Sequence, residues 1–154
     1  MPYRIVVAHD YGPEADAALA WAGALLRSTG GTLVLLHVIL VPAPPIKRVP
    51  MIPALRPTED PAASLEQLRA LAEKHAHAAE VDVFETGDAG PGIVLRARQL
   101  GATLIAIGAQ EKGRGGLSRA ILGSVIDHVV WHAHCPVTVV RSAPAPASAS
   151  RLPT

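Results

Sequence analysis

The stretch TLVLLHVI, residues 32–39, decides the fold, because apolar residues follow one another in it instead of alternating with polar ones. Such a run is typical of a strand that is buried on both faces, as in a parallel sheet with helices on both sides. Tyr3–His9 (YRIVVAH) and Thr103–Ile107 (TLIAI) are short apolar runs of the same kind. These three runs predict the central strands of one parallel sheet.

Helical patterns separate these strands. Glu14–Thr29 carries apolar residues on one face at helical spacing, and Gly30-Gly31 supply a C-terminal stop. The other elements that we expect are helices from Asp60-Pro61 to about Ala79, from the GDAGPG turn (87–92) to Leu100 and over Arg119–Ala133, and strands Val81–Glu85 and Val137–Arg141. Strands that alternate with helices predict right-handed crossovers, and therefore an open, doubly wound α/β sheet of parallel strands.

The bulk composition favours one folded domain. The chain has 154 residues, of which 49% are hydrophobic and 18% charged, so it can bury a core. A formal net charge of +1 and an aromatic content of 3% give no basis for binding nucleic acid or an anionic membrane. Cys135 is the single cysteine, no run approaches the ~20 apolar residues of a membrane span, and the N-terminus does not resemble a signal peptide. We therefore expect a cytoplasmic protein with neither nucleic acid nor membrane as a partner.

Two segments differ in composition from the rest. Prolines recur through residues 41–60, and no regular element tolerates so many missing N–H donors. Loops of this length are usually functional or disordered. Residues 142–154 consist largely of Ala, Pro and Ser, which is typical of a disordered tail. We expect one domain over residues 1–141, with a proline-rich loop at 41–60 and a tail at 142–154.

The segment KGRGGLSRAILGS, residues 112–124, places glycines after a central strand and ahead of a helix. Open α/β sheets bind ligands beyond the carboxyl ends of their strands. Bare backbone and helix N-termini offer N–H groups to anions, and Lys112, Arg114 and Arg119 add positive charge. One interpretation is therefore a phosphate site. The other is a flexible turn, with Gly123 present for close helix packing. The segment is neither a P-loop nor a dinucleotide-binding G-x-G-x-x-G.

Five blocks together resemble the universal stress protein (UspA-like) family, over about Tyr3 to Arg141. They are IVVAHD (5–10), TLVLLHV (32–38), IAIGA (105–109), GRGGLSRAILGSV (113–125) and HCPVTVVR (134–141). The resemblance implies a Rossmann-like fold, similar to the adenine nucleotide alpha hydrolases, with strand order 3-2-1-4-5. It also implies the ATP-binding branch of the family, whose pattern is G-x2-G-x9-G-[ST]. Gly113 and Gly123-Ser124 match its second part, but four residues instead of two separate Gly108 from Gly113.

The resemblance implies a nucleotide site at the strand ends. Asp10 would contact the ribose and phosphates and could hold Mg²⁺ with them; the alternative is an N-cap for the first helix, and both roles can coexist. The backbone at Val38 would contact adenine, and Gly123-Ser124 would hold phosphates. The nine implied binding residues are Ala8, Asp10, Val38, Ile107, Gly108, Gly113, Gly123, Ser124 and Val125.

The functional hypothesis is a universal stress protein that binds ATP and acts as a stress-response regulator or sensor, with protein partners that the sequence does not identify. One alternative is a dimeric interaction module of the same fold that binds no nucleotide, which the longer Gly108–Gly113 spacing favours. The other is a weak nucleotide hydrolase. The family's last strand commonly builds a homodimer, which implies pairing through Val137–Arg141. His128, His132, His134 and Cys135 could suggest a metal site, but we interpret them as ordinary structural residues.

Overall fold

The computed structural model describes residues 2–42, 57–75, 78–109 and 118–142, with side chains of the last range described from Gly123 onward. Its elements, in chain order, are β1 (Tyr3–Ala8), α1 (Pro13–Thr29), β2 (Gly31–Leu40), α2 (Pro61–His75), β3 (Glu80–Thr86), α3 (Ala89–Gln99), β4 (Leu104–Ala109), α4 (Ser118–His132) and β5 (Val137–Arg141). The strands form one five-stranded sheet in the order β3-β2-β1-β4-β5. Every neighbouring pair is parallel, which confirms the expected fold class and strand order.

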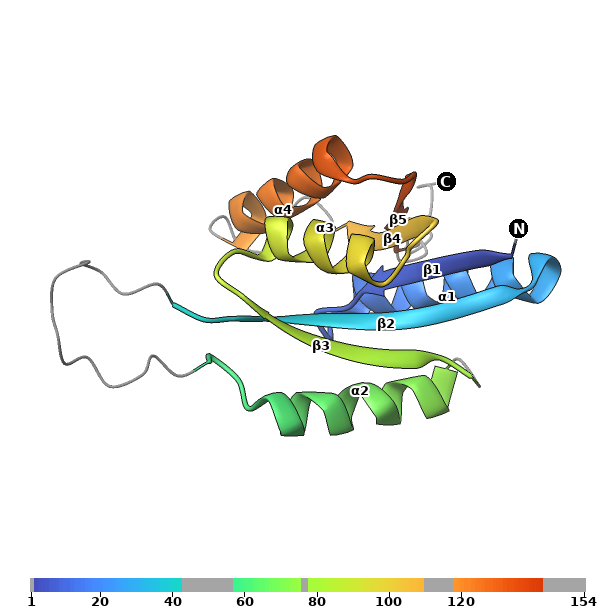
Figure 1. Ribbon diagram of the computed structural model, residues 1–154, viewed down its shortest axis with the longest axis horizontal. Coiled ribbons are helices and arrows are strands. Elements are labelled where there is room, and N and C mark those ends of the chain that lie inside the picture. Colours follow the sequence, from blue (N-terminus) through green and yellow to red (C-terminus); the bar gives the residue numbers. More distant parts are fainter. Residues whose placement is uncertain (1, 43–56, 76–77, 110–117, 143–154) are drawn as a thin grey trace, which may run out of the picture.

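Helices cover both faces of the sheet, so the molecule has three layers (Figure 1). Ile5 and Val7 of β1 pack with side chains of α1 and α2 on one face. Val6 and Ala8 face the opposite way and pack with side chains of α3 and α4. Because successive side chains of a strand point to opposite faces, a strand buried on both sides must be apolar at every position. This requirement explains the continuous apolar runs of the central strands.

The chain turns at the expected stops, with one difference. Gly30 ends α1 with a φ of 72°, and the Asp60 carboxylate accepts a hydrogen bond of 3.1 Å from the Ala62 N–H at the start of α2. The prediction that this helix runs to about Ala79 is wrong, because α2 is described over Pro61–His75 and residues 78 and 79 are not helical. Ala79 instead packs against the core beneath the sheet, immediately before β3 begins. Gly113, most of the proline-rich loop and nearly all of the predicted tail lie outside the described residues.

The strand order places the carboxyl ends of β1 and β4 at the switch point of the sheet. β1 pairs with β2 on one side and with β4 on the other, so the connections leave it in opposite directions. In open α/β sheets a crevice forms at this point, outside the strand ends. A ligand site is therefore expected near Ala8, Leu40 and Ala109, where β1, β2 and β4 end.

Gly108, in β4, allows α1 to lie close to the sheet. A Cβ atom built at this position would overlap the backbone of Glu14 and Ala15 in α1. Helix backbone cannot move aside as a flexible side chain can, so only glycine fits without shifting the helix. This glycine therefore has a packing reason that is independent of any ligand.

We expect Gly108→Ala to destabilise the protein by about 1–3 kcal/mol, because the added methyl group forces α1 away from β4. Gly87→Ala is the matched control, since no described atom lies within 4 Å of a Cβ at that position. Urea unfolding curves of both variants measure the effect as a shift in midpoint at constant slope. Equal midpoints for the two variants would show that the packing of α1 on β4 does not require glycine at position 108.

Candidate functional site

A cavity of about 310 Å³ lies at the carboxyl ends of β1, β2 and β4. Its walls are largely apolar, and its ionisable side chains are His9, Asp10, His37 and Glu59. Mostly apolar pockets with a few convergent polar groups are typical of small-molecule sites. The cavity therefore has the position and the character of a ligand site.

Six of the nine implied binding residues line this cavity. They are Ala8, Asp10, Val38, Ile107, Gly108 and Val125. Gly123 and Ser124 precede Val125 on α4, where they are exposed and do not line the cavity itself. Gly113 lies outside the described residues. The fold thus gathers residues from four separate segments of the chain around one cavity, with the Gly123-Ser124 pair beside it.

Asp10 orients its carboxylate through a turn and does not cap the first helix. Its Oδ1 accepts a hydrogen bond of 2.9 Å from the Gly12 N–H. The N-cap of α1 is Gly12, which makes no side-chain capping bond. The N-cap alternative for Asp10 is therefore wrong: the helix begins at Pro13, three residues after Asp10, so the carboxylate bonds within the connecting loop.

His37 and Glu59 form a polar wall of the cavity that sequence reasoning missed. His37 is 5% exposed, and its Nδ1 lies 2.7 Å from the backbone oxygen of His9. Its Nε2 lies 2.8 Å from Oε2 of Glu59. The Ser64 hydroxyl donates to that same carboxylate oxygen at 3.0 Å. A histidine inside the apolar run of β2 was the available signal, but nothing in the sequence pointed to Glu59 as its partner.

Tyr11 holds the adjoining loop in place. It is a non-glycine residue with a φ of 68°, a backbone conformation that is uncommon and often found at functional sites. Its ring centroid lies 4.4 Å from that of His37, and its hydroxyl donates to the backbone oxygen of Ser64 at 3.1 Å. Burial raises the pKa of Tyr11, the side chain of Ser64 opposes that rise, and the charge of Glu59 adds to it.

His9, on the same loop, is almost wholly buried, and its ring makes two hydrogen bonds. Its Nδ1 accepts from the Tyr11 N–H at 3.0 Å, so its Nε2 carries a proton and donates to Oδ1 of Asp16 at 2.9 Å. The β1–α1 loop is thereby linked to α1 through Asp16 and to α2 through Tyr11. These bonds fix one side of the cavity.

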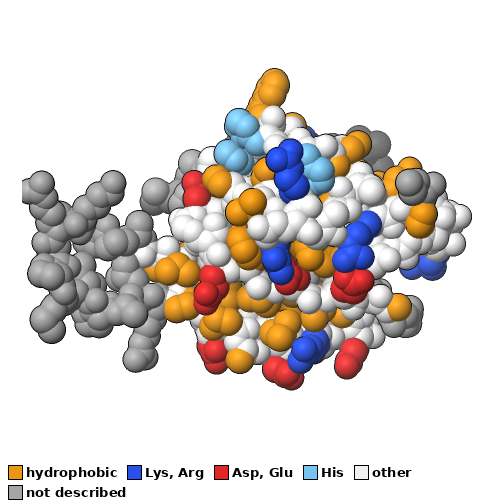
Figure 2. Space-filling view, in the orientation of Figure 1, with side chains coloured by type: hydrophobic (Ala, Val, Ile, Leu, Met, Phe, Trp, Pro, Cys, Tyr) orange, Lys and Arg blue, Asp and Glu red, His pale blue; other side chains and the backbone are white. Residues whose placement is uncertain are grey.

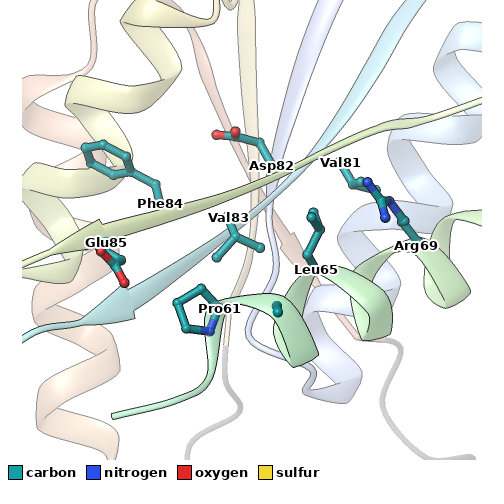
Figure 3. A pocket seen from close by; sticks show the side chains of 9 residues that line it. Pro61, Leu65, Arg69, Val81, Asp82, Val83, Phe84 and Glu85 are labelled. Carbon is teal, nitrogen blue, oxygen red and sulfur yellow. The ribbon is translucent and has the colours of Figure 1, made fainter. Parts of the chain in front are cut away.

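A second hollow, of about 690 Å³, lies between α2 and the edge strand β3 (Figure 3). Pro61 and Leu65 of α2 face Val83 across it. Two of its charged side chains have partners, because Asp82 accepts hydrogen bonds of 2.6 and 2.9 Å from Arg96, and Arg69 donates to Glu66 at 3.3 Å. It also lies away from the switch point of the sheet. The cavity at the strand ends is therefore the better candidate.

The histidines near the C-terminus do not gather into a metal centre in the part of the chain that the structure describes. Histidine side chains lie over α4 in Figure 2. The rings of His128 and His132 pack with their centroids 4.2 Å apart, and Nε2 of His134 lies 2.9 Å from the backbone oxygen of Ala102.

Among the described helices, none has the length and hydropathy to cross a membrane.

Comparison with known proteins supports the resemblance to universal stress proteins. A model of the universal stress protein family matches residues 1–141. A universal stress protein of Synechocystis sp. is 46% identical over 54 residues, covering 35% of this chain and 48% of the relative. One from Mycolicibacterium smegmatis is 28% identical over 161 residues, covering 98% of this chain and 52% of the relative. The chain thus spans about half the length of the relatives that it matches.

Solved structures of the family share the fold. A universal stress protein in complex with cAMP is 18% identical, with a TM-score of 0.63 over 93% of this chain and 100% of that one. One from Archaeoglobus fulgidus in complex with dAMP is 21% identical, with a TM-score of 0.61 over 91% and 98%. One from Arabidopsis thaliana with AMP bound is 20% identical, with a TM-score of 0.60 over 97% of each chain.

Sequence, architecture and family model agree on the class of protein. At the identities of these three structures, the similarity establishes the fold and no more. The family model carries the assignment, because it covers far more than half of the chain. This chain belongs to the universal stress protein family.

Proposed function

We propose that the protein binds an adenine nucleotide, ATP with or without Mg²⁺, in the cavity at the strand ends, and that it acts as a stress-response regulator. The observation that carries the proposal is the gathering of Ala8, Asp10, Val38, Ile107, Gly108 and Val125 around that cavity. Related structures with AMP, dAMP or cAMP bound support an adenine nucleotide as the class of ligand.

The size of the cavity suits the nucleoside part of such a ligand. Its volume of about 310 Å³ is at the lower end of the range for small-molecule pockets. The phosphates would then extend past Val125 toward Gly123 and Ser124, which lie exposed on the preceding residues of α4. An apolar chamber for the base beside an exposed site for the phosphates matches the chemistry of a nucleotide.

Gly123 supports the phosphate site because no neighbour among the described residues explains it. No described atom lies within 4 Å of a Cβ built at this position. Glycine in a helix interior costs up to about 1 kcal/mol relative to alanine, so a glycine that no described neighbour requires is unfavourable for the free protein. Close approach of a ligand to the backbone supplies the missing reason.

Two other functions remain testable. The four residues between Gly108 and Gly113, where the family pattern has two, favour an interaction module that binds no nucleotide. Denaturing the purified protein and identifying any released nucleotide by chromatography, together with titration of ATP–Mg, separates this case from the proposal. Weak hydrolysis would require phosphate release well above that of Ser124→Ala and Asp10→Asn. The cytoplasmic location expected from the sequence stays a prediction.

We expect Gly123→Ala to fold at least as stably as the wild type and to lose nucleotide affinity by about tenfold or more, roughly 1.4 kcal/mol. The new methyl group adds helix propensity but occupies the space into which the phosphates would extend. Thermal melting measures the first effect, and calorimetric titration with ATP–Mg and AMP measures the second. Gly87→Ala controls for the added methyl group alone. Unchanged affinity in Gly123→Ala would remove the phosphates from this part of α4.

We also propose a homodimer that pairs through β5. β5 is an edge strand of the sheet, and Val139 on it is 39% exposed. An unpaired edge with exposed apolar side chains is a template for pairing with another strand.

We expect Val139→Lys to shift the protein from dimer to monomer, because pairing the edges would bring two buried lysines together. Sedimentation equilibrium measures the change. Leu95→Lys, on the 50%-exposed Leu95 of α3, is the matched control and should remain dimeric. A monomeric wild type, or a dimer that persists in Val139→Lys, would refute pairing through β5.

A further inference from the structure

The contact between His37 and Glu59 requires a proton that a neutral imidazole and a carboxylate do not supply. Nδ1 of His37 faces a backbone carbonyl, which only accepts, so Nδ1 carries a hydrogen and donates it. In a neutral imidazole the other nitrogen, Nε2, then holds a lone pair. An ionised Glu59 also only accepts. Two acceptors cannot make the contact of 2.8 Å between Nε2 and Oε2, so the pair holds one additional proton.

This proton ties a segment of the chain to the sheet. Thr58 donates two hydrogen bonds of 3.1 Å, from its N–H and its hydroxyl, to the backbone oxygen of Leu40 at the end of β2. The next residue, Glu59, bonds to His37 of the same strand, and the backbone of Asp60 accepts from the Ser64 N–H at 3.0 Å. Residues 57–60, which we call the strap, therefore connect the end of β2 to the start of α2.

The strap forms part of the candidate ligand cavity. Thr58 and Glu59 line it together with His37, Val38 and Leu40 of β2. The bonds of Thr58 are between neutral groups, and the bond from Ser64 reaches Glu59 whether or not the proton is present. The His37–Glu59 contact is thus the one link, among those described for the strap, that loss of a proton turns from attraction to repulsion.

The groups around the pair do not provide another explanation for the contact. From β1, the backbone oxygen of His9 accepts from His37; from the β1–α1 loop, the phenol of Tyr11 packs on the imidazole ring. From α1, Asp16 is engaged by His9, and from α2 the neutral Ser64 hydroxyl faces Glu59. Asp10 also lines the cavity, with its Oδ1 engaged by Gly12. Within the described residues, no hydrogen bond or ion pair joins a cation other than His37 to Glu59.

We propose that Glu59 is a positioning residue that holds the strap against the cavity through a proton shared with His37, and that this proton couples ligand affinity to pH. One proton taken from solvent lies between Nε2 and Oε2 when the wall is in place. When the pair releases it to solvent, two lone pairs face each other, Glu59 moves away, and the cavity loses part of its wall. The coupling to affinity rests on the proposed nucleotide function, whereas the coupling of the strap to the proton does not.

The first arm of the test uses the wild-type protein without ligand, so it is independent of nucleotide binding and of any variant. ¹⁵N-labelled protein is titrated by NMR from about pH 5 to about pH 9, across the range in which histidines commonly change charge. We expect the Nε2 resonance of His37 and the backbone amides of Thr58, Glu59 and Asp60 to shift together, with one midpoint. A strap whose amides do not follow His37 overturns the proposal.

The second arm measures AMP affinity over the same range. If the wall is in place in about a tenth of the molecules at high pH, the affinity falls about tenfold. In Glu59→Gln the amide donates to the lone pair of Nε2 and to Ser64 without an additional proton, so we expect an affinity that stays near the low-pH value. Titration of the AMP phosphate cancels in the ratio of the two proteins.

Glu66→Gln is the matched control, because Glu66 lies on α2 with its side chain 78% exposed and paired with Arg69. It should retain the wild-type pH profile. Identical profiles for wild type and Glu59→Gln, or wild-type affinity that rises with pH, overturn the coupling to ligand. If AMP, ADP and ATP bind at no pH while the strap still titrates with His37, the proposed function fails and the proton-held strap stands.

Discussion

Burial of β1 and β2 on both faces is the constraint on which the rest of the structure depends. Ile5 and Val7 must face α1 and α2, while Val6 and Ala8 must face α3 and α4. Both layers of helices can be reached only if the chain crosses over after every strand, and such crossovers make neighbouring strands parallel. Parallel strands end on the same side of the sheet, so the residues that follow β1, β2 and β4 meet there. The position of the candidate site is thus a consequence of the core.

His37 is the exception to this constraint, and it is informative for that reason. A polar side chain inside a buried strand is costly unless its hydrogen bonds are made. His37 makes both, one to the backbone of His9 and one to Glu59. The second bond joins residues on either side of the proline-rich segment, so a buried strand position fixes where the chain returns before α2. The same histidine that weakens the apolar pattern of β2 also shapes the cavity wall.

The fold could be predicted because its signals are local and repeated. The run TLVLLHVI reports two-sided burial by itself, and Gly30 and Asp60 mark helix boundaries by their own backbone and side-chain chemistry. The sequence pattern extends this helix too far, because alanines near residue 79 favour a helix while the entry into β3 packs Ala79 against the core. Propensity is a weak prior where tertiary packing competes with it.

The site could be predicted only in the parts that motifs carry. Ala8, Asp10 and Val125, which the resemblance implied, line one cavity, and their role in binding stays a prediction. The His37–Glu59 wall could not be foreseen, because it joins positions 22 residues apart across the proline-rich segment, and only the folded chain brings them to 2.8 Å. The N-cap interpretation of Asp10 is wrong for a related reason. The number of loop residues before α1 depends on the left-handed backbone conformation of Tyr11, and a tyrosine in the sequence does not predict that conformation.

The two glycines at the ends of the phosphate pattern differ in whether packing requires them. They therefore differ in how strongly they support a phosphate site. Gly108 is required by the close approach of α1, whereas no described neighbour requires Gly123. A glycine that packing explains says little about a ligand, so the longer interval between Gly108 and Gly113 counts only weakly against nucleotide binding. Loops tolerate insertions as long as the elements on either side keep their positions. Gly123 therefore supports a bound phosphate more strongly than the four-residue spacing between Gly108 and Gly113 opposes one.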